Sequence, residues 1–193
     1  MSDRGRQRGE IRRAKVVLDN LTGPLSITKG GTGAITSSAA RSSLGLGTAA
    51  TQAYTELTFT PTLMFGGASV DMTYDAQVGR AIKTGKCVAF QINIDLSAKG
   101  TSTGNVTVGL GTLGSSYPLV TATGYAAVFF VHARQVTLNT AGGFYSVAAQ
   151  SASGDSTISL YEQGTSVGIT PLTDADFANN SVITISGVYE AAT

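Results

Sequence analysis

The chain has 193 residues, of which 13% are charged and 24 are glycine, and it contains no tryptophan. This composition excludes the usual make-up of a helical enzyme. It favours short strands joined by tight turns, because β-branched residues fit a pleated surface. The hydrophobic share of 42% is enough for a packed core and excludes wholesale disorder. We therefore expect an all-β protein.

Residues 1–24 differ from the rest of the chain in charge. The first 15 residues carry six basic and two acidic side chains, a net charge of +4, whereas the other 178 carry seven basic and ten acidic ones, a net charge of −3. An apolar run, Val16-Val17-Leu18, follows the basic segment. The region is too short to form a core, so we expect a peptide that becomes ordered when it binds a partner.

Residues 25–53 are expected to form a strand, a turn and a short helix. Leu25 and Ile27 alternate with polar residues, as in a short strand. The glycines that follow permit backbone angles that side chains forbid, as a sharp turn requires; they are Gly30, Gly31 and Gly33.

The short helix is predicted over Ser37–Leu44. Thr36 suits its N-cap, and Gly45 suits the position after its end. The whole segment is too small to bury apolar residues such as Leu44, so we expect neighbouring copies of the chain to cover them.

Residues 54–193 are predicted to form the main domain. Apolar and polar residues alternate from Cys87 to Leu96, which indicates a half-buried strand. A hairpin turn at Lys83–Lys86 is expected to join it to a strand over Val78–Ile82. Further strands are expected at Leu57–Phe65, Ser69–Tyr74, Val106–Leu110, Ala126–Leu138, Phe144–Ala149, Thr157–Tyr161 and Val182–Tyr189.

Clusters of Gly, Ser, Thr, Asn and Asp connect these strands, and Asp174–Asn180 is expected to form a single helical turn. No stretch suits a helix long enough to join two parallel strands. Many short strands at this spacing predict an antiparallel β-sandwich or a jelly-roll-like domain.

Cys87 is the only cysteine, which excludes a disulfide within one chain. The sequence shows neither the apolar segment of a secretory signal nor a long apolar run. We therefore expect synthesis in a cytoplasm and no membrane partner.

The second region resembles the repeat of bacteriophage tail fibre proteins. Residues 30–36, GGTGAIT, and 40–47, ARSSLGLG, follow that family's pattern, which is roughly GGTGA-x-T, then an Ala-Arg pair, then LGLG. Phe59–Tyr74 looks like the opening of the C-terminal domains that follow such repeats. Asp174–Phe177 and Ile185–Tyr189 look similar to the way those domains close.

The resemblance implies an intertwined homotrimeric fibre that is attached to the virion by its N-terminus and presents a distal domain to the host surface. Long fibres repeat the motif, whereas it occurs once here, so the resemblance implies a short fibre on the tail, the baseplate or, as a second choice, the capsid. It assigns the trimer neck to residues 25–53, and the neck residues are Gly30, Gly31, Gly33, Arg41, Leu44 and Leu46.

The N-terminal region has three interpretations. It anchors the fibre in an acidic socket of another virion protein, it contacts nucleic acid phosphates, or it is a solvated tail. Residues 1–53 contain no aromatic side chain to stack on bases, so nucleic acid is the least favoured partner. The anchoring hypothesis rests on Arg4, Arg6, Arg8, Arg12, Arg13, Val16, Val17 and Leu18.

Host contact is expected on loops, which vary on a rigid scaffold, and the partner is expected to be a cell-surface glycan or protein. The candidate loops are Ala98–Gly104, Ser115–Tyr117, Asn139–Phe144 and Tyr161–Ser166. Tyrosine rings in or near these loops are candidates for stacking on sugars, although strand tyrosines more often pack within a sheet; they are Tyr117, Tyr145 and Tyr161.

We expect no catalytic residue, no metal and no cofactor. His132 is the only histidine, which leaves a metal site without partners, and we expect it to be packed or at an interface. No serine lies in a Gly-x-Ser-x-Gly frame. Lys29 precedes the glycine turn, which excludes a phosphate-binding loop. Paired acids for a hydrolase are available from Asp71, Asp75, Asp95, Asp155 and Glu162.

The expected function is therefore that of a non-enzymatic virion fibre of the tail or baseplate that attaches the particle to its host. A capsid head fibre or decoration protein is the first alternative, and a small polysaccharide hydrolase is the second.

Overall fold

A computed structural model describes residues 23, 25, 31–46, 54–118, 127–151, 156–164 and 168–192. The chain divides into two compact units, Met1–Gln52 and Ala53–Thr193. The predicted residues Arg4 to Leu18, Ile27 and Gly30 lie outside the described residues. No helix in the described part of the chain is long and apolar enough to cross a membrane.

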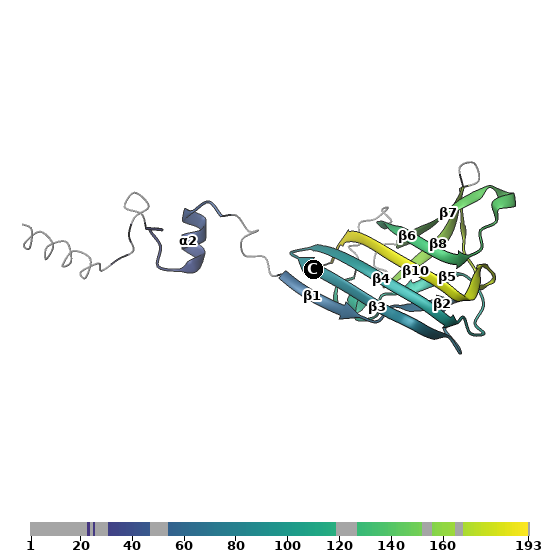
Figure 1. Cartoon of the computed structure of the whole chain (residues 1–193). Coiled ribbons are helices and arrows are strands. Elements are labelled where there is room, and N and C mark those ends of the chain that lie inside the picture. Colours follow the sequence, from purple (N-terminus) through teal and green to yellow (C-terminus); the bar gives the residue numbers. More distant parts are fainter. Residues whose placement is uncertain are drawn as a thin grey trace, which may run out of the picture. The chain divides into compact units, whose positions relative to one another are not determined.

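The first unit contains helix α2, Ser37–Ser43, as predicted (Figure 1). The Thr36 hydroxyl accepts a hydrogen bond from the Ala39 amide at 3.1 Å, which satisfies one of the free donors of the first turn. Gly45 follows the helix with φ +69°. The Leu46 amide then donates to the Arg41 carbonyl at 2.9 Å, a bond typical of helix ends that close with a left-handed glycine.

The turn before α2 requires glycine at two positions because of its backbone conformation and close packing. Gly33 has φ +66°, and its amide donates to the Leu25 carbonyl at 2.6 Å. A Cβ on Gly31 would overlap the side chain and the backbone of Leu25. The turn folds back closely enough that a side chain is excluded at Gly31 and disfavoured at Gly33.

The second unit is all-β and antiparallel, which confirms the predicted fold class. Ten strands follow the spatial order β1-β3-β4-β10-β6-β7-β8-β5-β2, and β9 pairs with β8. The strands are β1 Tyr54–Phe59, β2 Thr62–Phe65, β3 Thr73–Thr84, β4 Cys87–Ala98, β5 Val106–Gly109, β6 Ala127–Val136, β7 Phe144–Ser151, β8 Thr157–Gly164, β9 Gly168–Pro171 and β10 Phe177–Glu190. Short helices lie between some of them, namely α3 Gly111–Ser116, η3 Thr140–Gly142 and η4 Asp174–Asp176.

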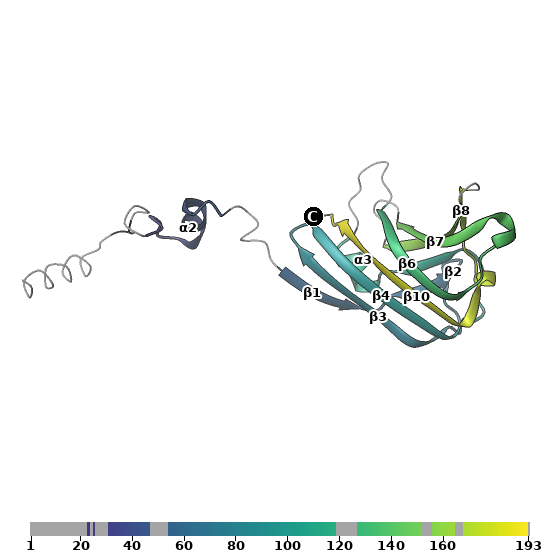
Figure 2. The ribbon, with the colours of Figure 1, turned by 45° about the horizontal axis from the view of Figure 1, so that its top comes forward.

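The sheet curls so that its two halves face one another (Figures 1 and 2). We call β1, β3, β4, β10 and β6 the first layer, and β7, β8, β5, β2 and β9 the second layer. Strand β6 belongs to both halves, because Phe130–Arg134 pair with β10 and Ala127–Phe129 pair with β7. The predicted two-layered arrangement is thus produced by one continuous curled sheet.

Pro61 divides what was predicted to be one strand, Leu57–Phe65. Strand β1 lies at one edge of the sheet and β2 at the other, and Thr60-Pro61 joins them. Proline has no amide hydrogen to donate to a strand ladder, so the chain leaves the first layer here and enters the second. This short connection brings the two edges of the curled sheet together.

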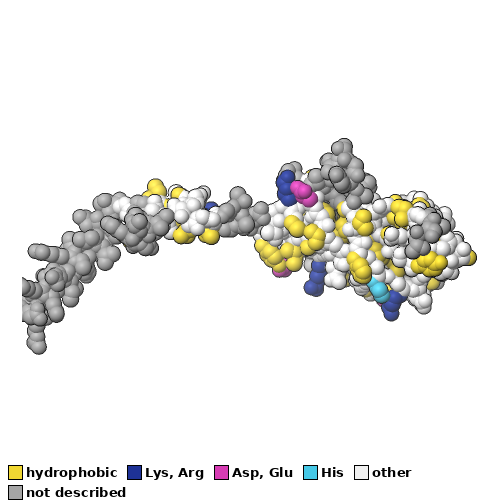
Figure 3. All heavy atoms as spheres, turned by 90° about the horizontal axis from the view of Figure 1, so that it is seen from above, with side chains coloured by type: hydrophobic (Ala, Val, Ile, Leu, Met, Phe, Trp, Pro, Cys, Tyr) yellow, Lys and Arg dark blue, Asp and Glu magenta, His cyan; other side chains and the backbone are white. Residues whose placement is uncertain are grey.

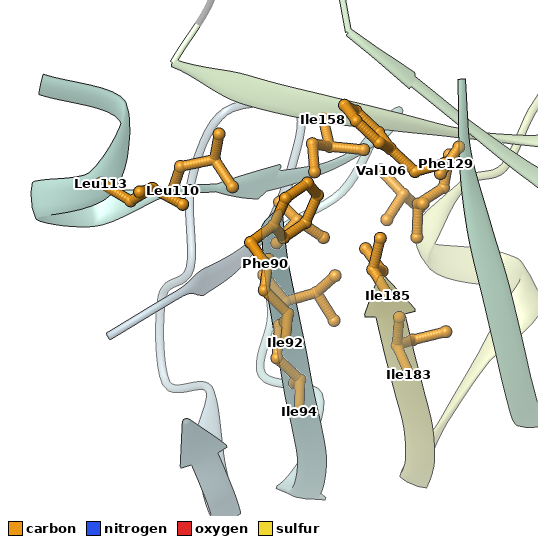
Figure 4. Close-up of a cluster of buried hydrophobic side chains, with 14 of the residues drawn as sticks. Phe90, Ile92, Ile94, Val106, Leu110, Leu113, Phe129, Ile158, Ile183 and Ile185 are labelled. Atoms are coloured by element: carbon orange, nitrogen blue, oxygen red, sulfur yellow. The ribbon is translucent and has the colours of Figure 1, made fainter. Parts of the chain in front are cut away.

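The core fills the space between the layers (Figure 4). Strand β4 follows the predicted alternation, with Ile92 and Ile94 fully buried. The Phe90 ring packs edge-to-face against the rings of Phe129 and Tyr189, with centroid distances of 5.0 and 5.8 Å. Burial of these side chains is the main stabilising contribution to the domain.

Two other predictions need correction. Of the expected strand Ser69–Tyr74, only the last two residues are in β3, and the others belong to the β2–β3 connection, in which Gly66, Gly67 and Asp71 have positive φ. The helical turn predicted at Asp174–Asn180 stops at Asp176, and Phe177 begins β10. Helix α3 and strand β9 were not predicted.

The ends of the domain differ in structure. At one end Tyr54 begins β1, the Lys86 carbonyl accepts from the Ala191 amide, and the Pro118 carbonyl accepts from the Ala192 amide, both at 2.8 Å. We call this the terminal end, because strand β1 enters and the chain leaves the domain here (Figure 1).

The other end of β3 and β4 is the loop end, where connections are tied together by hydrogen bonds. The Asp174 carboxylate accepts from the Gly104 amide at 2.7 Å, and the Asp174 carbonyl accepts from Lys99 Nζ at 2.9 Å. The Gly66 amide donates to the Asn105 carbonyl at 2.9 Å. These bonds hold the loops from three connections in fixed positions.

Candidate binding surfaces

The described part of the neck, residues 25 and 31–46, exposes apolar side chains. Helix α2 has no buried residue. Ile35 is 85% exposed, Leu44 56% and Leu46 49%. Arg41 is half-buried beside them. Exposed apolar groups gathered on so small an element are typical of a surface that contacts a partner.

The predicted tyrosines do not form one site. Tyr117 is at the terminal end, where its carbonyl accepts a hydrogen bond from the Tyr189 hydroxyl at 2.8 Å. Lys83 Nζ lies 5.2 Å from the Tyr117 ring centroid. Tyr145 is 65% exposed in β7, and Tyr161 lies on the outer surface of β8. Tyr117 therefore belongs to the packing of the terminal end and lies apart from the loop end.

Tyr161 is the centre of an uncharged surface on the second layer. Register places it between Ala148 of β7 and Pro171 of β9, and Tyr161 is half-buried there. We call this surface the Tyr161 platform; its outward residues are Ser146, Ala148, Gln150, Ser159, Tyr161, Gln163, Ile169 and Pro171. An aromatic ring surrounded by hydroxyl and amide groups offers an apolar contact together with donors and acceptors, which suits a sugar ring.

The outer surface of the first layer is more apolar. Figure 3 shows hydrophobic side chains gathered on the domain with a few charged ones among them. A cross-strand row runs from Ile82 through Ala89 to Val188, which are opposite one another on β3, β4 and β10. We call this surface the apolar face and define it by Tyr54, Ile82, Cys87, Ala89, Phe130 and Val188.

Nine large hydrophobic side chains are exposed in the described part of residues 54–192, and six of them lie on strands of the first layer. Phe130 is 72% exposed and Val188 60%. The six residues are Tyr54, Val78, Ile82, Val128, Phe130 and Val188, and Val128 lies where β6 pairs with the second layer, opposite Gln150. This concentration on one layer distinguishes it from the Tyr161 platform.

Open hollows adjoin the apolar face. One of about 600 Å³ is lined by residues of β1 and β3, including Glu56 and Ile82. A second of about 290 Å³ lies over Ile82 and Ala89, and a third of about 430 Å³ adjoins Cys87 and Val188. The surface is therefore uneven enough to interlock with another protein surface.

The groups considered for catalysis are scattered. Glu162 is buried, and its carboxylate accepts from the Asn139 amide at 2.9 Å, which holds the β6–β7 connection. Asp71 lies in the loop end and accepts from the Thr101 hydroxyl at 3.3 Å. Asp95 points outward from β4 opposite Ala76.

The two remaining acidic residues considered for catalysis are Asp75 and Asp155. Asp75 is exposed in β3, next to Asp95, and Asp155 lies outside the described residues. His132 is exposed on β6 opposite Thr184, so it is not packed in the core. Among the residues that the structure describes, no three His, Cys, Asp or Glu side chains form a group that suits a metal ion.

Two tyrosine hydroxyls at the terminal end, those of Tyr54 and Tyr189, have a raised pKa. Burial raises the pKa of the Tyr189 hydroxyl to about 12. A hydrogen bond of 2.9 Å from the Tyr54 hydroxyl to the Glu56 carboxylate raises the pKa of Tyr54. Both groups are therefore neutral donors near pH 7, and Tyr189 serves the packing of the terminal end.

Comparison with known proteins finds similarity in structure. No protein-family model matches the chain, and no curated protein sequence matches it either. The chain is similar to the crystal structure of Dettilon tailspike protein (gp208), with a TM-score of 0.56 and 16% sequence identity. The similarity covers 72% of this chain and 24% of the tailspike chain, so the chain spans about a quarter of that protein's length. At this identity the similarity shows a shared fold.

Proposed function

We propose that the chain is a non-enzymatic structural fibre protein of a bacteriophage virion, located on the tail or baseplate. It assembles as a homotrimer and attaches the particle to the host surface. The observation that carries this proposal is the neck, where the exposed apolar side chains of Ile35, Leu44 and Leu46 flank a helix with no buried residue.

Self-association is the simplest way to cover the neck. Ile35, Leu44 and Leu46 come from a segment of sixteen described residues, 31–46, which cannot fold around them. Three copies arranged about an axis bury the same side chains against one another, as closed cyclic oligomers do. The glycine turn and the capped helix give each copy the same fixed shape, which such an arrangement needs.

The domain fold supports a virion location. Its similarity to a protein named as a tailspike agrees with the fibre repeat that residues 30–47 resemble. These two observations are independent, because one concerns the fold of residues in the second unit and the other concerns the sequence of the first.

The N-terminal region is proposed as the anchor. Its net charge of +4 within 15 residues favours an acidic surface of another virion protein. The apolar Val16-Val17-Leu18 run then supplies side chains that become buried on binding.

Host attachment is assigned to the Tyr161 platform and to the loop end. A single weak sugar contact with a dissociation constant of about 1 mM contributes roughly −4 kcal/mol. Three platforms on one trimer gain on the order of 10²–10⁴ in avidity when they engage together. A shallow surface is therefore sufficient, and no deep pocket is needed.

Particle assembly tests the proposal directly. A chain that lacks residues 1–24 should fold and self-associate but should be absent from purified particles, whereas the full chain should be present. Density maps of intact particles should then place it on the tail or baseplate. Density on the capsid would instead indicate a head fibre, and complete absence of the full chain from particles would refute a virion role.

A further inference from the structure

We propose that the apolar face is a second self-contact, through which neighbouring copies of the domain pack against one another. This inference rests on the proposed self-association of the neck and identifies a surface of the domain that takes part in it. The occupant is another copy of this chain.

The composition of the face supports burial. The outward row Ile82, Ala89 and Val188 presents only aliphatic groups over three adjacent strands, and Phe130 projects beside it from β6. Solvent contact with these groups is unfavourable by about 25 cal/mol for each Å² of apolar surface. Interfaces between identical chains are more apolar than the rest of a protein surface, as this row is.

The charges around the face favour a second copy over an oppositely charged partner. Glu56 lies diagonally opposite Arg80 across β1 and β3, and Lys86 Nζ lies 3.7 Å from the Glu190 carboxylate. Two acidic and two basic side chains leave no net charge. A nucleic acid or an anionic membrane surface would require an excess of basic residues, whereas a balanced face can be matched by an identical one.

Covalent connection to the neck raises the local concentration of the face. Tyr54 is part of the face and follows Leu46 by eight residues. A fully extended chain of that length spans at most about 28 Å. Copies that share a neck therefore hold their apolar faces at an effective concentration in the millimolar range.

The size of the face explains why it needs this connection. Five strands spaced at about 4.8 Å, and about five residues along each, give a projected area of roughly 400 Å². Stable interfaces bury about 800 Å² on each partner. The face is therefore too small to hold two free domains together, but it is large enough to order domains that are already joined.

Cys87 provides a built-in probe. It is exposed in the single chain, it lies on the face opposite Glu190, and it is the only cysteine in the sequence. Alkylation by iodoacetamide therefore reports on this face alone. We expect Cys87 of the full chain to react at least tenfold more slowly than Cys87 of an Ile82→Gln variant, in which the contact is weakened.

A matched control uses the other layer. Ile169 is 49% exposed on β9 and Ile82 is 43% exposed on β3, so Ile169→Gln makes the same chemical change at similar exposure. We expect Ile169→Gln to leave the alkylation rate of Cys87 unchanged. Phe130→Gln, a second substitution on the face, should accelerate it as Ile82→Gln does.

Sedimentation of the same samples separates this inference from the proposed function. If the full chain sediments as an assembly but Cys87 reacts equally fast in the full chain, Ile82→Gln and Ile169→Gln, the apolar face is not buried and the inference is wrong. If the full chain sediments as a monomer, self-association through the neck is wrong. Slow reaction in an assembly and fast reaction after Ile82→Gln or Phe130→Gln support the inference.

Discussion

Replacement of Leu44 by glutamine removes an apolar side chain from the neck while keeping its length. Leu44 is 56% exposed in the single chain. Complete burial of a leucine contributes about 1.5–3 kcal/mol, so covering its exposed half contributes roughly 1 kcal/mol for each chain. A trimer contains three such side chains and should lose about 3 kcal/mol. Each 1.4 kcal/mol is a factor of ten, so the dissociation constant should rise by about two orders of magnitude.

Sedimentation equilibrium over a range of concentrations measures this change. The full chain and Leu44→Gln should differ in the concentration at which the assembly dissociates, and their circular dichroism spectra should agree. Ser43→Gln is the matched control, because Ser43 is a polar and exposed residue next to Leu44, at the end of helix α2. It should leave the dissociation constant within a factor of about three.

Equal dissociation constants for the wild-type chain and Leu44→Gln would refute the argument. That result would mean that the exposed side of the neck is not the surface through which the chains associate. An equally large effect of Ser43→Gln would show that helix stability, and not apolar burial, determines association.

Three further predictions concern the domain. Gly79→Ala should lower the free energy of unfolding in urea by about 1–3 kcal/mol, because a Cβ there would lie 2.7 Å from Phe59 Cδ2. In a Phe59→Leu background, the destabilisation by Gly79→Ala should fall below about 1 kcal/mol. An unchanged destabilisation in that background would contradict the contact between the two residues. Tyr161→Ala should weaken binding to host cells at least tenfold without changing the oligomeric mass, whereas Tyr117→Phe at the terminal end should leave binding unchanged. Equal losses of binding in the two variants would exclude the Tyr161 platform as the surface that contacts the host. Because burial raises the pKa of Tyr189 from 10.0 to about 12, folding favours its protonated form, so this contribution to stability is complete below pH 10 and is lost as the pH rises to about 12. The free energy of unfolding, measured by urea titration at pH 9 and at pH 12, should therefore decrease less for Tyr189→Phe than for the wild-type chain.

Local features of the fold were predictable from the sequence. The helix after Thr36 is determined by a hydroxyl cap and by Gly45, both within a few residues of the helix. The strand at Cys87–Ala98 follows from strict alternation, and the turn before it from Gly85, which has φ +60°. In each case the determining residues are neighbours in the sequence.

Features that depend on distant residues were missed. Pro61 lies within an apolar run, and only the closure of the curled sheet shows that the strand must divide there. The apolar face combines Ile82, Ala89 and Val188, and Val188 follows Ala89 by 99 residues. No local pattern identifies such a row, because pairing of β10 with β4 creates it. The hydrogen bond that holds Tyr117 at the terminal end also joins distant residues, because its donor is the Tyr189 hydroxyl, 72 positions later in the chain.

The native mass of the full chain tests the central claim most directly. Native mass spectrometry at micromolar concentration should give about 59 kDa, which corresponds to three chains of 19.7 kDa. A single species of 19.7 kDa under the same conditions would mean that the neck keeps its leucines exposed, and it would contradict the fibre proposal.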